Sequence, residues 1–229
     1  MVFARDVCRR MDRATVWLLS LTALLLTSCG REAGPGAPGP PGKWLTLKRC
    51  RLLENTFNDG DSFHVRFDER EFIFRLYFVD CPEVTESDPE RNREQCRYFG
   101  VTAAKNRAAG IEAGKVTAQL LRKPFTVTTR SQDALGRSKL RRYYADVTVD
   151  GADLADLLVS RGLARVKGKP ADLPDGSSGK QRMKNLQRLE KEAKAKRLGI
   201  WADSRMTDQR SWLRKILDWG LRRDSPHKE

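Results

Sequence analysis

Four acidic residues stand close together along the first half of the sequence. Asp59 and Asp61 flank a glycine just before a strand that alternates apolar and polar residues, and Asp80 and Glu83 follow a second strand that is apolar on both faces. Carboxylates that meet at one end of a hairpin repel each other unless a cation lies among them, and oxygen ligands suit a hard ion such as Ca²⁺ rather than zinc. The pattern predicts a calcium site, although Asp-Gly is also a common turn pair and a plain turn is the alternative.

The pairing of the two strands decides how near these acids come to each other. If Phe67 pairs with Phe72 across the polar turn, Asp61 lies opposite Phe78, and Asp80 is two residues farther along. Diagonal neighbours of this kind are about 7–8 Å apart. We therefore expect Asp61 and Asp80 to share one end of the hairpin.

One positive charge lies inside the apolar second strand. Arg75 stands in the middle of Glu71–Asp80, where a buried guanidinium without an anion would cost several kcal/mol. Two kinds of anion could pair with Arg75. One is a neighbouring carboxylate in an internal salt bridge, and the other is a phosphate, whose oxygens match the guanidinium bidentately. His64, on the polar face of the first strand, is interpreted as an outward-facing residue without a catalytic role.

The composition favours a polyanionic partner. The 229 residues carry a formal net charge of +14, which indicates nucleic acid or an anionic membrane surface, with a solvated Lys/Arg surface as the alternative. A structural zinc site is not indicated, because the five cysteines form no Cys-x-x-Cys pair and the chain has two histidines.

The N-terminal residues resemble an export signal followed by a tether. Residues 1–28 combine a basic start with an apolar run that is too short to span a bilayer comfortably. The run ends in Leu26-Thr27-Ser28-Cys29, which resembles the lipobox of bacterial lipoproteins; an ordinary cleaved signal is the alternative. We expect a lipid on Cys29 and an exported, membrane-anchored protein, with the outer membrane favoured by Gly30. Residues 29–43, rich in glycine and proline, predict an extended tether.

Four motifs follow in order within residues 47–202. They are Asp59-Gly60-Asp61 with the strand Arg75-Leu76-Tyr77-Phe78-Val79-Asp80-Cys81-Pro82-Glu83, the turn Asp133-Ala134-Leu135-Gly136-Arg137, the segment Asp150–Val166, and a basic helix ending in Leu198-Gly199-Ile200-Trp201. Each alone is a weak signal, but together they resemble the staphylococcal-nuclease (thermonuclease) family. The resemblance implies an α+β fold over residues 44–202, a small five-stranded OB-type barrel with about three helices.

The resemblance also implies a metal site and a general base. Asp61 and Asp80 would bind Ca²⁺ through their carboxylates, and Cys81, which replaces the usual threonine, through its backbone carbonyl. Glu83 would orient or deprotonate the attacking water.

Two arginines would act on the substrate. By resemblance, Arg75 and Arg137 bind the scissile phosphate and stabilise the charge of the transition state, with Asp59 and Asp133 as supporting residues. The implied substrate is DNA and/or RNA, with single strands preferred, and we expect a monomer. A nucleic-acid-binding module of the same fold without catalysis is the alternative, and a basic structural lipoprotein is a third possibility.

The sequence departs from the family in three places. About fifteen extra residues lie within Thr85–Ala109, before the first family helix at Gly110, and we expect them to form an extra helix near the cleft. The aromatic residues that the family uses for base stacking are replaced by Leu135, Gly168, Lys169 and Pro170. In an oxidising compartment a Cys81–Cys96 disulfide is favoured, which would fix the insertion beside the calcium loop.

A basic amphipathic tail, residues 203–229, lies beyond the resemblance. Its apolar residues recur at helical spacing among arginines, which suits packing on the domain, lying on a membrane or binding nucleic acid.

Overall fold

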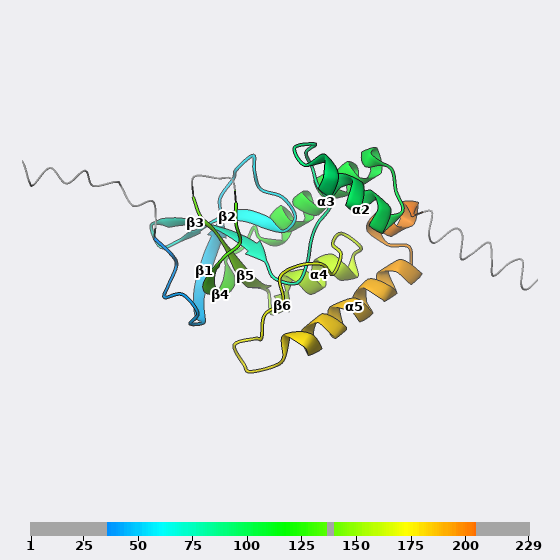
Figure 1. Cartoon of the computed structure of the whole chain (residues 1–229). Coiled ribbons are helices and arrows are strands. Elements are labelled where there is room, and N and C mark those ends of the chain that lie inside the picture. The colour runs from blue at the N-terminus through cyan, green and yellow to red at the C-terminus, as the bar shows by residue number, and fades with distance from the viewer. Residues whose placement is uncertain (1–35, 137–139, 205–229) are drawn as a thin grey trace, which may run out of the picture. The chain divides into compact units, whose positions relative to one another are not determined.

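The computed structural model describes residues 36–136 and 140–204 (Figure 1). Its strands are β1 (Leu45–Leu52), β2 (Ser62–Phe67), β3 (Arg70–Leu76), β4 (Phe125–Asp133), β5 (Arg142–Val149) and the short β6 (Ala152–Asp153). They form one sheet in the order β3-β2-β1-β4-β5-β6, and a parallel pairing of β3 with β5 closes it into a barrel. The predicted α+β class, a small five-stranded barrel with helices, is confirmed.

The strands show the burial that their sequences dictate. β4 and β5 largely alternate buried with more exposed residues, while the second half of β3 is buried on both faces. Phe63, Val65, Phe74 and Val127 fill the barrel and are each at most 1% exposed. The core therefore holds rigid the two strand ends from which the acidic residues project.

The β2–β3 hairpin differs in register from the expected pairing. Phe67 pairs with Arg70 and not with Phe72, so the turn holds two residues instead of four. Every strand partner shifts accordingly, and the expected position of Asp61 opposite Phe78 is wrong by two residues.

His64 is buried, and the expectation that it faces outward is wrong. The loop before β2 covers it: Asn58 Oδ1 accepts a hydrogen bond from the His64 backbone N–H at 2.9 Å and lies 2.8 Å from His64 Nδ1. Asn58 Nδ2 in turn donates to the Leu53 carbonyl at 2.7 Å. Ser62 and His64 on the polar face of β2 are therefore buried, whereas Arg66 on the same face stays exposed. Alternation within the strand does not reveal the loop that covers His64.

The helices are α2 (Pro89–Phe99), α3 (Ala103–Leu120), α4 (Leu154–Ser160), α5 (Gly179–Ala195) and the 3₁₀ helix η1 (Gly199–Asp203). The expected inserted helix is confirmed as α2, beside α3 in Figure 1. The following helix begins at Ala103 and not at Gly110, because Thr102 caps it with its side chain.

The end of α2 and the last segment pack together in a second core. Phe99 and Trp201 lie with ring centroids 4.9 Å apart, and Ala193 and Ile200 complete the cluster. α2 is thus anchored at its C-terminal end to α5 and η1, which leaves its N-terminal half to face the loop after β3.

The segment after α4 passes close to that same loop. A Cβ atom on Gly168 would lie 2.4 Å from the Val79 nitrogen, and the Gly168 N–H donates to the Phe78 carbonyl at 2.8 Å. An aromatic residue, which the resemblance expects here, would therefore clash with the backbone.

The compact unit begins at Ala37, and the Gly42 N–H donates to the Arg130 carbonyl of β4 at 2.9 Å. The signal, Cys29, Arg137 and the tail from residue 205 onward lie outside the described residues, and what was predicted of them stays a prediction. Among the described residues, no helix is long and apolar enough to cross a membrane.

Candidate active site

Arg75 joins the two aspartates that the sequence analysis singled out. Its Nη1 lies 3.3 Å from Asp61 Oδ1, and its Nη2 lies 2.9 Å from Asp80 Oδ1. All three side chains are buried, and the charge of Asp61 raises the pKa of Arg75 above its ordinary value, with burial opposing and Asp80 assisting. Of the two anions considered for Arg75, the internal carboxylates are present in the structure.

Asp61 is otherwise held by neutral donors. Its Oδ2 accepts the Cys81 backbone N–H at 2.7 Å, and the Ser62 hydroxyl lies 3.1 Å from its Oδ1. Asp59 Oδ1 accepts the backbone N–H groups of Asp61 and Ser62 at 2.9 and 2.6 Å, which fixes the turn that leads into β2. Burial and the charge of Asp61 raise the pKa of Asp59 to about 8.

Asp80 is held by charged donors on both oxygens. Oδ1 pairs with Arg75 and Arg91, while Oδ2 accepts from Arg165 Nε at 2.8 Å and Gln95 Nε2 at 3.0 Å. Burial acts to raise the pKa of Asp80, but the charges of Arg91, Arg165 and Arg75 outweigh it and lower that pKa. The carboxylate is therefore already neutralised by protein cations.

Glu83 lies at the mouth of the cluster. Its Oε1 is 3.0 Å from Arg91 Nε, and its backbone N–H donates to Gln95 Oε1 at 2.8 Å. Burial raises the pKa of Glu83, and the charge of Arg91 only partly offsets this. A carboxylate with a raised pKa and one partly exposed face is suited to accept a proton from water.

The inserted helix α2 supplies much of the surrounding framework. Gln95 is fully buried and also donates to the Cys81 carbonyl at 2.9 Å. Glu94 binds Arg165 with two hydrogen bonds, 2.9 and 2.6 Å long, and the hydrogen bond from Arg165 is the main cause that lowers the pKa of Glu94 to about 2. The Arg165 guanidinium also lies over the Tyr98 ring, 5.1 Å from its centroid.

Comparison with known families decides the classification. A family model described as staphylococcal nuclease homologue matches residues 73–203. The chain belongs to the staphylococcal nuclease family. No curated protein matches the sequence. The matched range contains Arg75, Asp80 and Glu83, whereas Asp61 lies before it, immediately ahead of β2.

Nucleases of this family typically use Ca²⁺, and the expected ligand atoms lie in one cluster. In the described arrangement they do not fit the ion. Both oxygens of Asp61 and of Asp80 accept hydrogen bonds from protein donors, and the Cys81 carbonyl is bound by Gln95. Within residues 36–136 and 140–204, no group of three or more His, Cys, Asp or Glu side chains is arranged to hold a metal.

Most of the predicted site residues come together. The cluster contains six of them: Asp59, Asp61, Arg75, Asp80, Cys81 and Glu83. Asp133 lies at the end of β4, where its Oδ1 accepts the Leu135 N–H at 2.8 Å and shapes the turn toward Arg137.

The favoured disulfide is absent from the described cysteines. Cys50, Cys81 and Cys96 are free thiols. The Cys81 sulfur packs against Gly60, and the Cys96 sulfur lies 3.4 Å from Asn92 Oδ1. The Cys81–Cys96 prediction is wrong because the two side chains engage different neighbours.

A second arginine stands beside Arg75. Arg142 Nη1 and Arg75 Nη1 approach the same Ser62 hydroxyl at 3.3 and 3.4 Å, and Arg142 Nε is buried without a hydrogen-bond partner. Burial and the charge of Arg75 both lower the pKa of Arg142. Two like charges this close favour an anion between them.

Sequence reasoning missed four residues of the site: Arg91, Gln95, Arg142 and Arg165. The first two share one face of α2 at a spacing of four residues, a signal that an amphipathic reading of the insertion could have found. Arg165 reaches Asp80 across 85 positions of sequence, which no local pattern reveals.

Proposed function

We propose that this protein is a nuclease that hydrolyses phosphodiester bonds of DNA and/or RNA, with single strands preferred. One observation carries the proposal: Arg75 is buried in the barrel beside Asp61 and Asp80, with Glu83 in the same cluster, in a chain of this family. The net charge of +14 supports a polyanionic substrate.

The cluster provides one residue for proton transfer and two arginines for charge stabilisation. Glu83 accepts the proton of the attacking water, since its raised pKa makes it a stronger base than an exposed glutamate. Arg75 stabilises the negative charge that grows on the phosphoryl oxygens, and Arg142 lies where it adds a second guanidinium. Arg137 stays the predicted partner of Arg75 in this role.

Calcium dependence stays a prediction from the family. An ion bound by Asp61, Asp80 and the Cys81 carbonyl would supply Lewis-acid chemistry at the phosphate. The arrangement described here has these atoms bound to protein donors, so we derive no step through the ion.

A second function is favoured by one observation. Asp80 is saturated by three arginines, an arrangement that also suits a nucleic-acid-binding barrel without catalysis. Such a module would bind oligonucleotides through its surplus of basic residues and leave them intact.

One assay separates the two functions. The full chain, purified in mild detergent, is incubated with fluorescent single- and double-stranded DNA and RNA, in calcium or in chelator. Cleavage that disappears in a Glu83→Gln variant supports the nuclease. Salt-sensitive binding without cleavage in either condition would contradict it and support the binding module.

We also propose that the protein is exported and anchored through a lipid on Cys29. The short apolar run that ends in the lipobox-like sequence supports this. Cys29→Ala should move the protein from the membrane to the soluble fraction, with loss of the acyl mass. Equal membrane association of the two forms, with no acyl mass on either, would contradict the anchor.

A further inference from the structure

Arg91 bridges the two carboxylates that line the mouth of the site. Its Nη2 contacts Asp80 Oδ1, and its Nε lies 3.0 Å from Glu83 Oε1. It comes from the inserted helix α2, so its position is a consequence of the insertion and not of the barrel.

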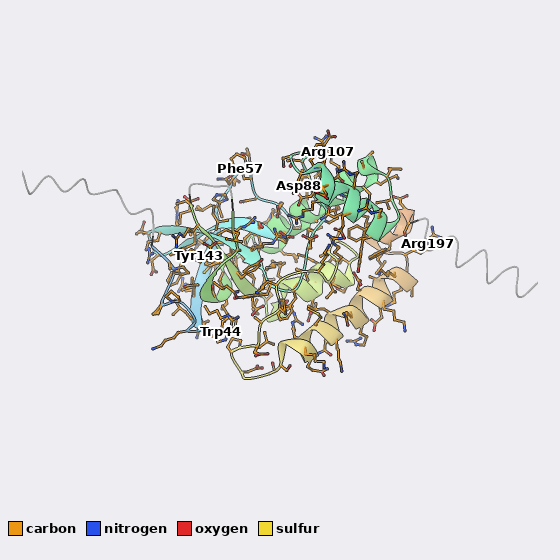
Figure 2. The ribbon with its side chains drawn as sticks, in the orientation of Figure 1. Trp44, Phe57, Asp88, Arg107, Tyr143 and Arg197 are labelled. Carbon is orange, nitrogen blue, oxygen red and sulfur yellow. The ribbon has the colours of Figure 1, made fainter. Side chains whose placement is uncertain are left out.

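The helix holds Arg91 in place from both sides. Asp88, labelled in Figure 2, caps the helix by accepting the Arg91 backbone N–H at 3.0 Å. One turn later, Gln95 binds Asp80 Oδ2 and the Cys81 carbonyl, which docks this face of the helix onto the loop. Arg91 therefore approaches the carboxylates on a rigid support.

Arg91 differs from the other two cations of Asp80. The side chains of Arg75 and Arg165 are 11% and 2% exposed, and Arg165 is further bound by Glu94. The Arg91 side chain is 33% exposed. Of these three guanidinium groups, Arg91 is the one that can leave its carboxylates by turning into solvent.

We infer that Arg91 is the resident cation of this site, and that a divalent cation binds Asp80 and Glu83 only by displacing it. The inference rests on the proposed function in that it takes this cluster as the active site. A guanidinium and a divalent ion need the same oxygen atoms, and their like charges exclude simultaneous occupancy at contact distance. Removing Arg91 leaves Asp80 with two arginines instead of three and takes away the arginine that pairs with Glu83, and the loss of this positive charge favours a replacement cation.

Calcium binding measured by titration calorimetry tests the inference without reference to activity. The full chain in mild detergent is compared with Arg91→Gln and with Arg93→Gln, which removes the same charge from an exposed position on the same helix. We expect Arg91→Gln to bind Ca²⁺ at least about tenfold more tightly than wild type, and Arg93→Gln to stay within about twofold, because of these two arginines it is Arg91 that pairs with Asp80 and Glu83.

Several results would overturn the inference. They are equal calcium affinity in wild type and Arg91→Gln, no calcium binding by either, or an equal gain in Arg93→Gln. If a thermal melt shows Arg91→Gln unfolded, Arg91→Lys replaces it; lysine keeps the charge but does not span both carboxylates, so an affinity equal to wild type would then be the contradicting result. Calcium binding as expected, in a protein that cleaves no nucleic acid, would contradict the proposed function alone.

Discussion

Asp61 and Asp80 contact the same arginine but are held in opposite ways. Beyond Arg75, Asp61 receives a hydroxyl and a backbone N–H, both neutral, and has the raised-pKa carboxyl of Asp59 beside it. Asp80 receives two further guanidinium groups and a buried amide. On the barrel side, Asp61 is therefore held by one arginine and neutral donors, whereas Asp80, on the side covered by α2, is neutralised by three arginines.

The difference shows what an insertion can do to the candidate active site while the barrel stays unchanged. Arg75 comes from β3 and Asp61 from the turn that leads into the neighbouring β2, whereas Arg91 and Gln95 come from a helix added between β3 and α3. The added helix brings a guanidinium and an amide to Asp80, while Asp61 keeps its neutral donors. Each prediction below tests one side of this contrast.

The largest effect is expected from Arg165, the most buried cation on the α2 side. Arg165→Met should lower the free energy of unfolding by about 3–5 kcal/mol, because Asp80 loses a buried partner. Urea unfolding measures it, with Arg188→Met as control; Arg188 forms an exposed pair with Glu192 and should cost less than about 1 kcal/mol. Similar losses in both variants would show that Asp80 does not depend on this arginine.

The next largest effect is expected on catalysis from the barrel side. Arg75→Lys keeps the charge but loses the planar fork that spans Asp61 and Asp80, so kcat should fall on the order of 10²-fold. Arg107→Lys, an exposed exchange on α3, is the control, and a thermal melt of each variant checks folding. A folded Arg75→Lys protein with unchanged kcat would show that Arg75 does not bind the scissile phosphate of the substrate.

A third effect is expected in the pH dependence of stability. The pKa of Asp59 is about 8 in the folded protein, above its ordinary 3.8, so the folded state binds the extra proton. The stability that this proton contributes is complete below pH 3.8 and is lost as the pH rises toward 8. Asp59→Asn keeps the Oδ1 acceptor of the turn, and its stability should fall less between pH 4 and 8 than that of wild type in urea unfolding. If the free energy of unfolding changed with pH in the same way in wild type and in Asp59→Asn, the pKa of Asp59 would not be raised in the folded protein.

The site residues on the barrel side could be predicted from the sequence, but those that the inserted helix α2 contributes could not. Alternation in the segment that forms β2, the doubly apolar β3 and the family resemblance carried by the ordered motifs predicted the fold, and Asp61, Arg75, Asp80 and Glu83 do meet. The hairpin register failed because a two-residue turn and a four-residue turn preserve the same alternation, so both leave the apolar faces matched.

The remaining errors arise from contacts between distant segments. His64 is buried by a loop that lies outside its own strand, and Arg165 meets Asp80 and Glu94 only after the chain has completed the barrel. α2 was expected as a helix. Which of its faces packs on the loop after β3 depends on the contacts of Gln95 with Asp80 and Cys81, and these tertiary contacts cannot be read from the sequence of the helix alone.

The kcat of Glu83→Gln on a fluorescent single-stranded oligonucleotide tests the central claim most directly. Glutamine keeps the size of Glu83 but cannot take a proton, so kcat should fall about 10²-fold or more while KM changes little. Glu112→Gln, an exposed change on α3, should leave both constants unaltered. A folded Glu83→Gln protein with the kcat of wild type would contradict the assignment of this cluster as the active site.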